Sequence, residues 1–146
     1  MVKFAILLLL SLLALIAKAE SSLELEKESR GARERPTIVK ILIEENGAWS
    51  DKRSSSDETP SMCASFILRE SDVRRFFRIA RFSSSYEQVH DLEISRCYAA
   101  GSAVLKDGRE AIWLIDRARL GVFKFPDGNT QYFYCKKCDR KLYWSE

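Results

Sequence analysis

The chain has 146 residues, of which 46% are hydrophobic and 31% are charged, and its formal net charge is +3. This length suits one domain with a core of its own. Lys3 and Lys18 lie in a segment that we expect to be removed, which lowers the net charge to +1. A balance so close to zero gives no support for nucleic-acid binding.

Residues 1–19 have the three parts of a secretory signal peptide. Lys3 precedes an apolar run over residues 4–17 that only Ser11 interrupts, and Ala17-Lys18-Ala19 supplies the small-x-small pattern before a cleavage point. The apolar run is shorter than the roughly 20 residues that span a membrane. We therefore expect cleavage after Ala19, export to the periplasm or the medium, and no membrane association afterwards.

A charged leader and the first strand follow the signal peptide. Residues 20–36 are polar and predict a flexible segment, so the domain proper is expected over residues 37–146. The β-branched run from Thr37 to Glu44 predicts a strand. Asn46-Gly47 predicts a tight hairpin turn with a short return strand over residues 48–51, and a serine-rich loop over residues 52–60 comes next.

An amphipathic helix is predicted from Ser71 to about Phe82, with Ser71 as its N-cap. The apolar positions recur at three- and four-residue steps: Val73, Phe76, Phe77 and Ala80. Arginines occupy the opposite side, which is typical of a solvated face. Arg74 and Arg78 on that side are also candidates for contact with an acidic protein partner.

The rest of the chain predicts strands joined by short turns. We expect strands over residues 93–98, 101–106, 109–115, 121–125 and 130–135, and a short edge strand over 142–144. Turn signals at Asp107-Gly108 and Asp127-Gly128 separate some of them. Sequential strands with tight turns pair antiparallel. The predicted fold is therefore α+β, a curved antiparallel meander of about five strands plus an N-terminal strand, packed on one amphipathic helix.

This order of elements resembles that of cystatin-like domains, in which a helix lies on a curved sheet. The resemblance covers element order alone. Gln88-Val89-His90-Asp91 does not match the QxVxG loop of cystatins, so none of that family's functional residues is carried over.

Four cysteines remain after signal cleavage: Cys63, Cys97, Cys135 and Cys138. An even number in an exported protein indicates disulfides, and we expect two long-range bonds that join each of the first two cysteines to one of the last two. The last pair also forms a CxxC motif beside Lys136 and Lys137, whose charges would favour a reactive thiolate. A structural role is preferred because the motif ends a strand. One close pair is too few for a four-cysteine zinc site, so no metal is expected.

Reactive motifs are otherwise missing from the sequence. His90 is the single histidine, and neither a Gly-x-Ser-x-Gly elbow nor a nucleotide-binding fingerprint is present, so no cofactor is expected. Aromatic residues crowd the last third of the chain. On the strand over residues 130–135, Tyr132 and Tyr134 share one face and Phe133 and Cys135 share the other. The tyrosines are therefore candidates for partner contact, with ordinary cross-strand packing as the alternative.

These observations favour a small exported, non-enzymatic domain that binds another protein, such as an inhibitor or a toxin-neutralising (immunity-type) protein. Two alternatives stay open. The first is a thiol–disulfide oxidoreductase that uses Cys135 and Cys138. The second is a secreted effector that binds a host or competitor target. The sequence leaves the partner's identity and the oligomeric state open.

Overall fold

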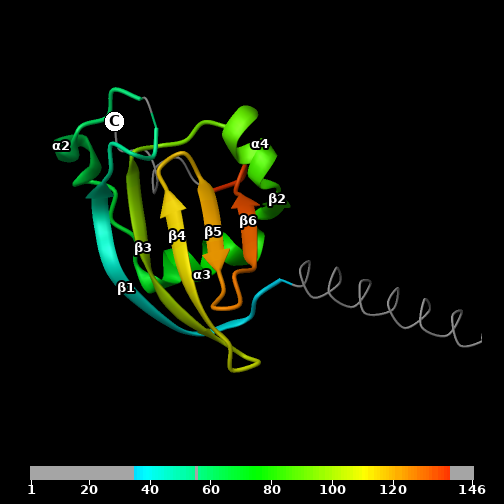
Figure 1. Cartoon of the computed structure of the whole chain (residues 1–146). Coiled ribbons are helices and arrows are strands. Elements are labelled where there is room, and N and C mark those ends of the chain that lie inside the picture. The colour runs from blue at the N-terminus through cyan, green and yellow to red at the C-terminus, as the bar shows by residue number, and fades with distance from the viewer. Residues whose placement is uncertain (1–34, 55, 139–146) are drawn as a thin grey trace, which may run out of the picture. The chain divides into compact units, whose positions relative to one another are not determined.

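The computed structural model describes residues 35–54 and 56–138. The expected signal peptide, most of the expected leader and the expected strand over 142–144 lie outside these residues. One six-stranded antiparallel sheet, in the order β1-β3-β4-β5-β6-β2, forms the centre of the domain (Figure 1). Its strands are β1 (Ile38–Trp49), β2 (Arg81–Ser83), β3 (Cys97–Leu105), β4 (Glu110–Asp116), β5 (Leu120–Lys124) and β6 (Thr130–Tyr134).

Three short helices accompany the sheet: α2 (Pro60–Cys63), α3 (Glu70–Ile79) and α4 (Ser85–His90). The predicted α+β class with an antiparallel sheet is confirmed. Helix α4 follows β2, and the Ser84 hydroxyl accepts the Glu87 amide proton at 3.1 Å and caps its start.

The hairpin predicted at Asn46-Gly47 is wrong, because β1 continues through these residues as one strand paired with β3. Gly47 has a φ of +64°, and the register shifts there, so the pair forms a bulge instead of a turn. At this bulge the Asn46 side chain accepts the Leu68 amide proton at 2.9 Å and donates to the Leu68 carbonyl at 2.8 Å. The break expected near residues 99–100 is also absent, since β3 runs unbroken from Cys97 to Leu105, and the strand predicted over residues 93–96 is wrong because the chain there is irregular.

Helix α3 begins one residue earlier than predicted, and Ser71 is not its cap. The Asp72 carboxylate instead accepts the backbone amide of Arg69, the residue before the helix, at 2.9 Å. The helix ends at Ile79 because Ala80 takes an extended conformation, which leads the chain into β2. The predicted helical end at Phe82 is therefore wrong.

Aromatic side chains fill the space between α3 and the sheet. Phe76 and Phe77 are fully buried, and the Phe77 ring centroid lies 4.2 Å from that of Phe123 on β5. Each such side chain contributes roughly 1.5–3 kcal/mol by leaving water. The helix comes so close that a Cβ added at Gly121 would lie 2.3 Å from Phe76 Cε1. Figure 1 shows α3 behind the sheet, which leaves most of the other sheet face in view.

Candidate functional site

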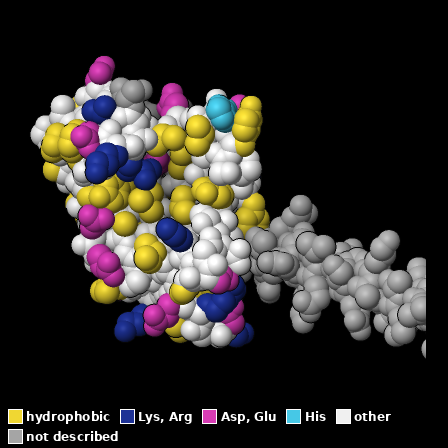
Figure 2. Space-filling model, viewed as in Figure 1, with side chains coloured by type: hydrophobic (Ala, Val, Ile, Leu, Met, Phe, Trp, Pro, Cys, Tyr) yellow, Lys and Arg dark blue, Asp and Glu magenta, His cyan; other side chains and the backbone are white. Residues whose placement is uncertain are grey.

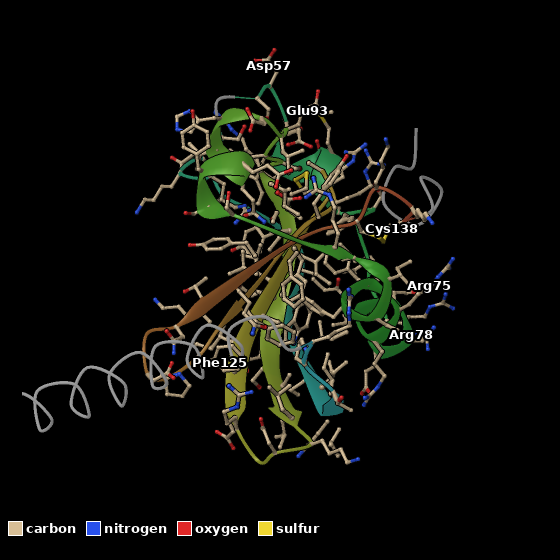
Figure 3. All side chains as sticks on the ribbon, turned by 90° about the vertical axis from the view of Figure 1, so that its right-hand side faces the viewer. Asp57, Arg75, Arg78, Glu93, Phe125 and Cys138 are labelled. Carbon is tan, nitrogen blue, oxygen red and sulfur yellow. A yellow bond between two sulfur atoms is a disulfide. The ribbon has the colours of Figure 1, made fainter. Side chains whose placement is uncertain are left out.

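The sheet face turned away from α3, called the open face below, has no layer covering most of it (Figure 1). Burial alternates along β3 and β6, so every second side chain points to this face. Helix α4 lies over one end of it (Figures 1 and 3). The open-face residues are Leu42, Tyr98, Ala100, Ser102, Val104, Ile112, Leu114, Val122, Lys124, Tyr132 and Tyr134.

Strand register aligns the apolar members of the open face in rows across the sheet. One row runs through Ala100, Leu114, Val122 and Tyr132 without a polar side chain between them. In the next row Leu42 and Ile112 are 54% and 63% exposed. Figure 2, drawn from this side, shows hydrophobic side chains spread across the middle of the sheet. Apolar side chains that gather on one face are typical of a protein contact.

Two arginines hold Tyr134 in place at one margin of the open face. The Arg81 guanidinium carbon lies 5.2 Å from the Tyr134 ring centroid, and the Arg119 guanidinium carbon lies 5.6 Å from it. Arg119 also donates to the Tyr134 hydroxyl at 3.3 Å and to the Lys136 carbonyl at 3.2 Å. Cation–π contacts of this kind restrain the ring. Glu87 bonds Arg81, and this pairing raises the pKa of Arg81 and lowers the pKa of Glu87.

Tyr98 is held in a similar way towards the other margin. The Arg53 guanidinium carbon lies 5.4 Å from its ring centroid, and its hydroxyl donates to Glu45 at 3.2 Å. Burial, reinforced by the negative charge of Glu45, raises the pKa of Tyr98. Glu44 accepts the Ser102 hydroxyl at 3.2 Å nearby. The open face therefore carries Glu44 and Glu45 near the middle of β1 and Arg119 beside Tyr134, while the exposed Lys40 and Lys124 lie further along β1 and β5.

The structure separates the four residues that the sequence offered for partner contact. Tyr132 and Tyr134 lie half-buried on the open face, whereas Arg74 and Arg78 belong to α3 on the opposite side of the sheet. Arg74 donates to the carbonyls of Ile38 and Val39 at 2.7 and 2.9 Å, so it fastens β1 to the helix. The arginines that meet the tyrosines are Arg81 and Arg119, which the sequence pattern had not singled out.

Sequence reasoning also missed the aliphatic part of the open face. Strand β4 is apolar on both sides, with Ala111, Trp113 and Ile115 buried and Ile112 exposed. An apolar run without alternation predicts a strand covered on both faces. The signal in the sequence was that Ile112 and Leu114, at the outward-facing positions of β4, are apolar as well.

The expected long-range disulfides are wrong. Cys63 of α2 bonds Cys97 at the start of β3, with their Cα atoms 4.9 Å apart, and Cys135 bonds Cys138, with their Cα atoms 5.3 Å apart. Strands β4 and β5 lie between β3 and β6, so Cys97 and Cys135 are separated by three strand spacings, about 14 Å. A disulfide cannot bridge Cα atoms more than about 7 Å apart. The presence of disulfides itself is confirmed.

A buried carboxylate fastens the loop that follows β1. Asp116 is fully buried and accepts the amides of Ser95 and Leu120 at 3.2 and 2.9 Å, and Arg53 from the loop at 3.0 Å. Burial raises the pKa of Asp116 to about 6, although these three donors oppose the rise. Glu58 adds a second fastening by accepting the Arg96 amide at 2.7 Å. The loop is therefore anchored in the core beside Tyr98.

Within residues 35–54 and 56–138, no three His, Cys, Asp or Glu side chains gather as metal ligands. The same residues contain no helix with the length and apolar character needed to cross a membrane. Comparison with known proteins adds no relative. No protein-family model matches the chain, and no curated protein and no solved structure matches it either.

Proposed function

We propose that this chain is an exported, non-enzymatic domain that binds another protein through its open face. The observation that carries the proposal is the uninterrupted apolar row of Ala100, Leu114, Val122 and Tyr132, whose four members are all partly exposed to solvent. Interface centres are apolar and rich in aromatic residues, and rigid tyrosines lose little entropy on binding. Tyr134 and Tyr98, each restrained by arginine, meet this requirement.

The charges around the row specify the partner's chemistry. Arg119 contacts Tyr134 and Lys124 is exposed opposite Thr130 on the same half of the sheet, whereas Glu44 and Glu45 bond Ser102 and Tyr98 from β1. A complementary surface would present an apolar ridge with carboxylates on the side that meets the tyrosines. We therefore favour a protein with an acidic, apolar contact surface over a second copy of this chain. Complementary charge of this kind sets orientation and association rate.

Two further features support export and a binding role. The candidate signal peptide over residues 1–19 directs the chain to the periplasm or the medium. The two disulfides are compatible with an oxidising compartment. Within this class we propose an inhibitor or toxin-neutralising (immunity-type) protein, with a secreted effector for a host or competitor target as the other member. The proposed activity uses no cofactor.

A matched pair of isoleucines tests the proposal. Ile112 on the open face is 63% exposed, and Ile67, which lies between α2 and α3 and outside the strands that form that face, is 53% exposed. A photo-crosslinking phenylalanine derivative is placed at either position in the exported protein within its native host. We expect one dominant adduct at Ile112 and none at Ile67, and mass spectrometry identifies the adduct.

Binding of the purified partner then decides the outcome. We expect Ile112→Asp to weaken it at least tenfold, because a charge would enter an apolar contact, and Ile67→Asp to change it less than twofold. Equal effects of the two variants, or no adduct at Ile112, would overturn the proposal. An adduct that contains only a second copy of this chain would replace the partner protein with a homodimer.

A thiol–disulfide oxidoreductase is the second candidate, and the local Cys135–Cys138 bond favours it. In such a reaction the dithiol form of this pair would reduce a substrate disulfide to two thiols and become the disulfide itself. We rank the oxidoreductase second because both cysteines are buried, at 1% and 5% exposed, where a substrate disulfide would not reach them. Insulin reduction in the presence of dithiothreitol tests it. Equal rates for the native protein and Cys135→Ser would exclude it.

A further inference from the structure

A second candidate site lies between the residues that lead into β1 and helix α3. Here the chain leaves a hollow of about 340 Å³, at the small end of the range of ligand sites. Arg35, Pro36, Thr37, Ile38, Arg74, Phe77 and Arg78 line it. Figure 3 shows the outer side of α3, with Arg75 and Arg78 directed away from the sheet. The hollow is thus separate from the open face.

Two of the lining arginines are fixed by backbone carbonyls. Arg35 Nη1 donates to the carbonyls of Phe77, Arg78 and Ala80 at the end of α3, at 3.0, 2.9 and 2.6 Å. Arg74 donates in the opposite direction, from α3 to the carbonyls at the start of β1. These contacts hold both guanidinium groups beside the hollow before any ligand arrives. A site whose donors are already ordered loses less entropy on binding.

Charge in the hollow is unbalanced among the residues that the structure describes, because three of its lining residues are arginines and none is an acid. Arg74 pairs with Glu70, whose carboxylate lies 4.0 Å from Arg74 Nη2. Towards the described residues Arg35 donates from Nη1, and its guanidinium carbon lies 5.6 Å from the Phe82 ring centroid. Arg78 has no ion pair within the part of the chain that the structure describes. Guanidinium groups favour phosphate and carboxylate because they donate two parallel hydrogen bonds.

Apolar groups form the other part of the lining. Ile38 is half-buried at the start of β1, and Phe77, which is buried, also lines the hollow. From this combination we propose that the hollow binds a small organic anion, with its phosphate or carboxylate on the arginines and an apolar body against Ile38 and Phe77. The proposal is independent of the protein partner proposed for the open face.

Neighbouring arginines of α3 provide a matched test. Arg78 lines the hollow, whereas Arg75 is exposed on the same helix and does not line it. Glutamine keeps helix propensity at both positions, so both variants should fold, and equal unfolding midpoints would verify this. The full exported chain is titrated with phenyl phosphate, and the backbone amide resonances are followed by NMR. We expect saturable shifts at Ile38 and Phe77, at least fivefold weaker binding in Arg78→Gln, and less than a twofold change in Arg75→Gln.

Three further probes separate the parts of the proposal. Phenylacetate binding more tightly than phenyl phosphate would assign a carboxylate ligand, and the reverse would assign a phosphate. Inorganic phosphate should bind at least fivefold more weakly than phenyl phosphate, and equal binding would overturn the apolar half. Benzyl alcohol should not bind, and saturation by it would overturn the role of charge. Equal weakening in Arg75→Gln and Arg78→Gln, or no saturation, would overturn the site.

Discussion

The stability of the domain should depend on pH through Asp116. Burial raises the pKa of this carboxyl from its ordinary value of 3.8 to about 6 in the folded protein. A folded-state pKa above the unfolded one stabilises the fold below pH 3.8, and this contribution disappears as the pH rises through about 6. The whole difference corresponds to about 3 kcal/mol at 1.36 kcal/mol per pKa unit. Between pH 7 and pH 5 the contribution of Asp116 should increase by about 1.3 kcal/mol.

Urea unfolding measures this increment, with the fluorescence of the buried Trp113 as the signal. The free energy of unfolding is obtained at pH 7, 6 and 5 for the native protein and for Asp116→Asn, with both disulfides intact. Subtracting the pH dependence of Asp116→Asn from that of the native protein removes the contribution of the titratable groups that the two proteins share. We expect the native protein to gain about 1.3 kcal/mol more than Asp116→Asn over this interval.

A second variant tests the direction of the reasoning. Arg53 lies 3.0 Å from the Asp116 carboxylate and favours its charged form. Arg53→Gln should therefore raise the pKa of Asp116 further and steepen the gain in stability on acidification. The reasoning is refuted if Asp116→Asn keeps the full native increment. It is also refuted if Arg53→Gln makes the pH dependence shallower.

Three other substitutions test the packing. Gly121→Ala should cost about 1–3 kcal/mol in urea unfolding, because its Cβ would lie 2.3 Å from Phe76 Cε1, and an unchanged midpoint would contradict this close approach. Replacing Cys63 and Cys97 by alanine should cost about 3.5–4 kcal/mol, since their bond closes a loop of sequence separation 34; an unchanged thermal midpoint would argue against the bond. Arg119 has a φ of +71°, so Arg119→Gly should be about 1 kcal/mol more stable than Arg119→Ala, and the reverse order would exclude backbone strain there.

The periodic pattern of apolar residues was sufficient to predict which side chains of one strand and of one helix are buried. The alternation around Tyr132 and Tyr134 correctly set these side chains apart from Phe133, because a strand has a period of two residues. The three- and four-residue spacing on α3 likewise identified Val73, Phe76 and Phe77, which are buried. Both patterns depend only on neighbours along the chain.

Contacts between distant segments explain the errors. Asn46-Gly47 has the residues of a hairpin turn, but the backbone of Leu68 satisfies the Asn46 amide and β1 continues through the bulge. The pairing of four cysteines depends on which strands are neighbours, and the sheet places β4 and β5 between Cys97 and Cys135. Neither contact has a signature in the residues that surround it.

The sequence by itself determined the antiparallel α+β class, the helix with its apolar side and the presence of disulfides, since each follows from local periodicity or composition. Only the tertiary structure decided the disulfide pairing, the exposure of Ile112 and Leu42 and the separation of the two tyrosines from Arg74 and Arg78. These properties depend on strand order and on the layer that packs on each sheet face. Both are set by the balance of long-range contacts against chain entropy, which a short stretch of sequence does not contain.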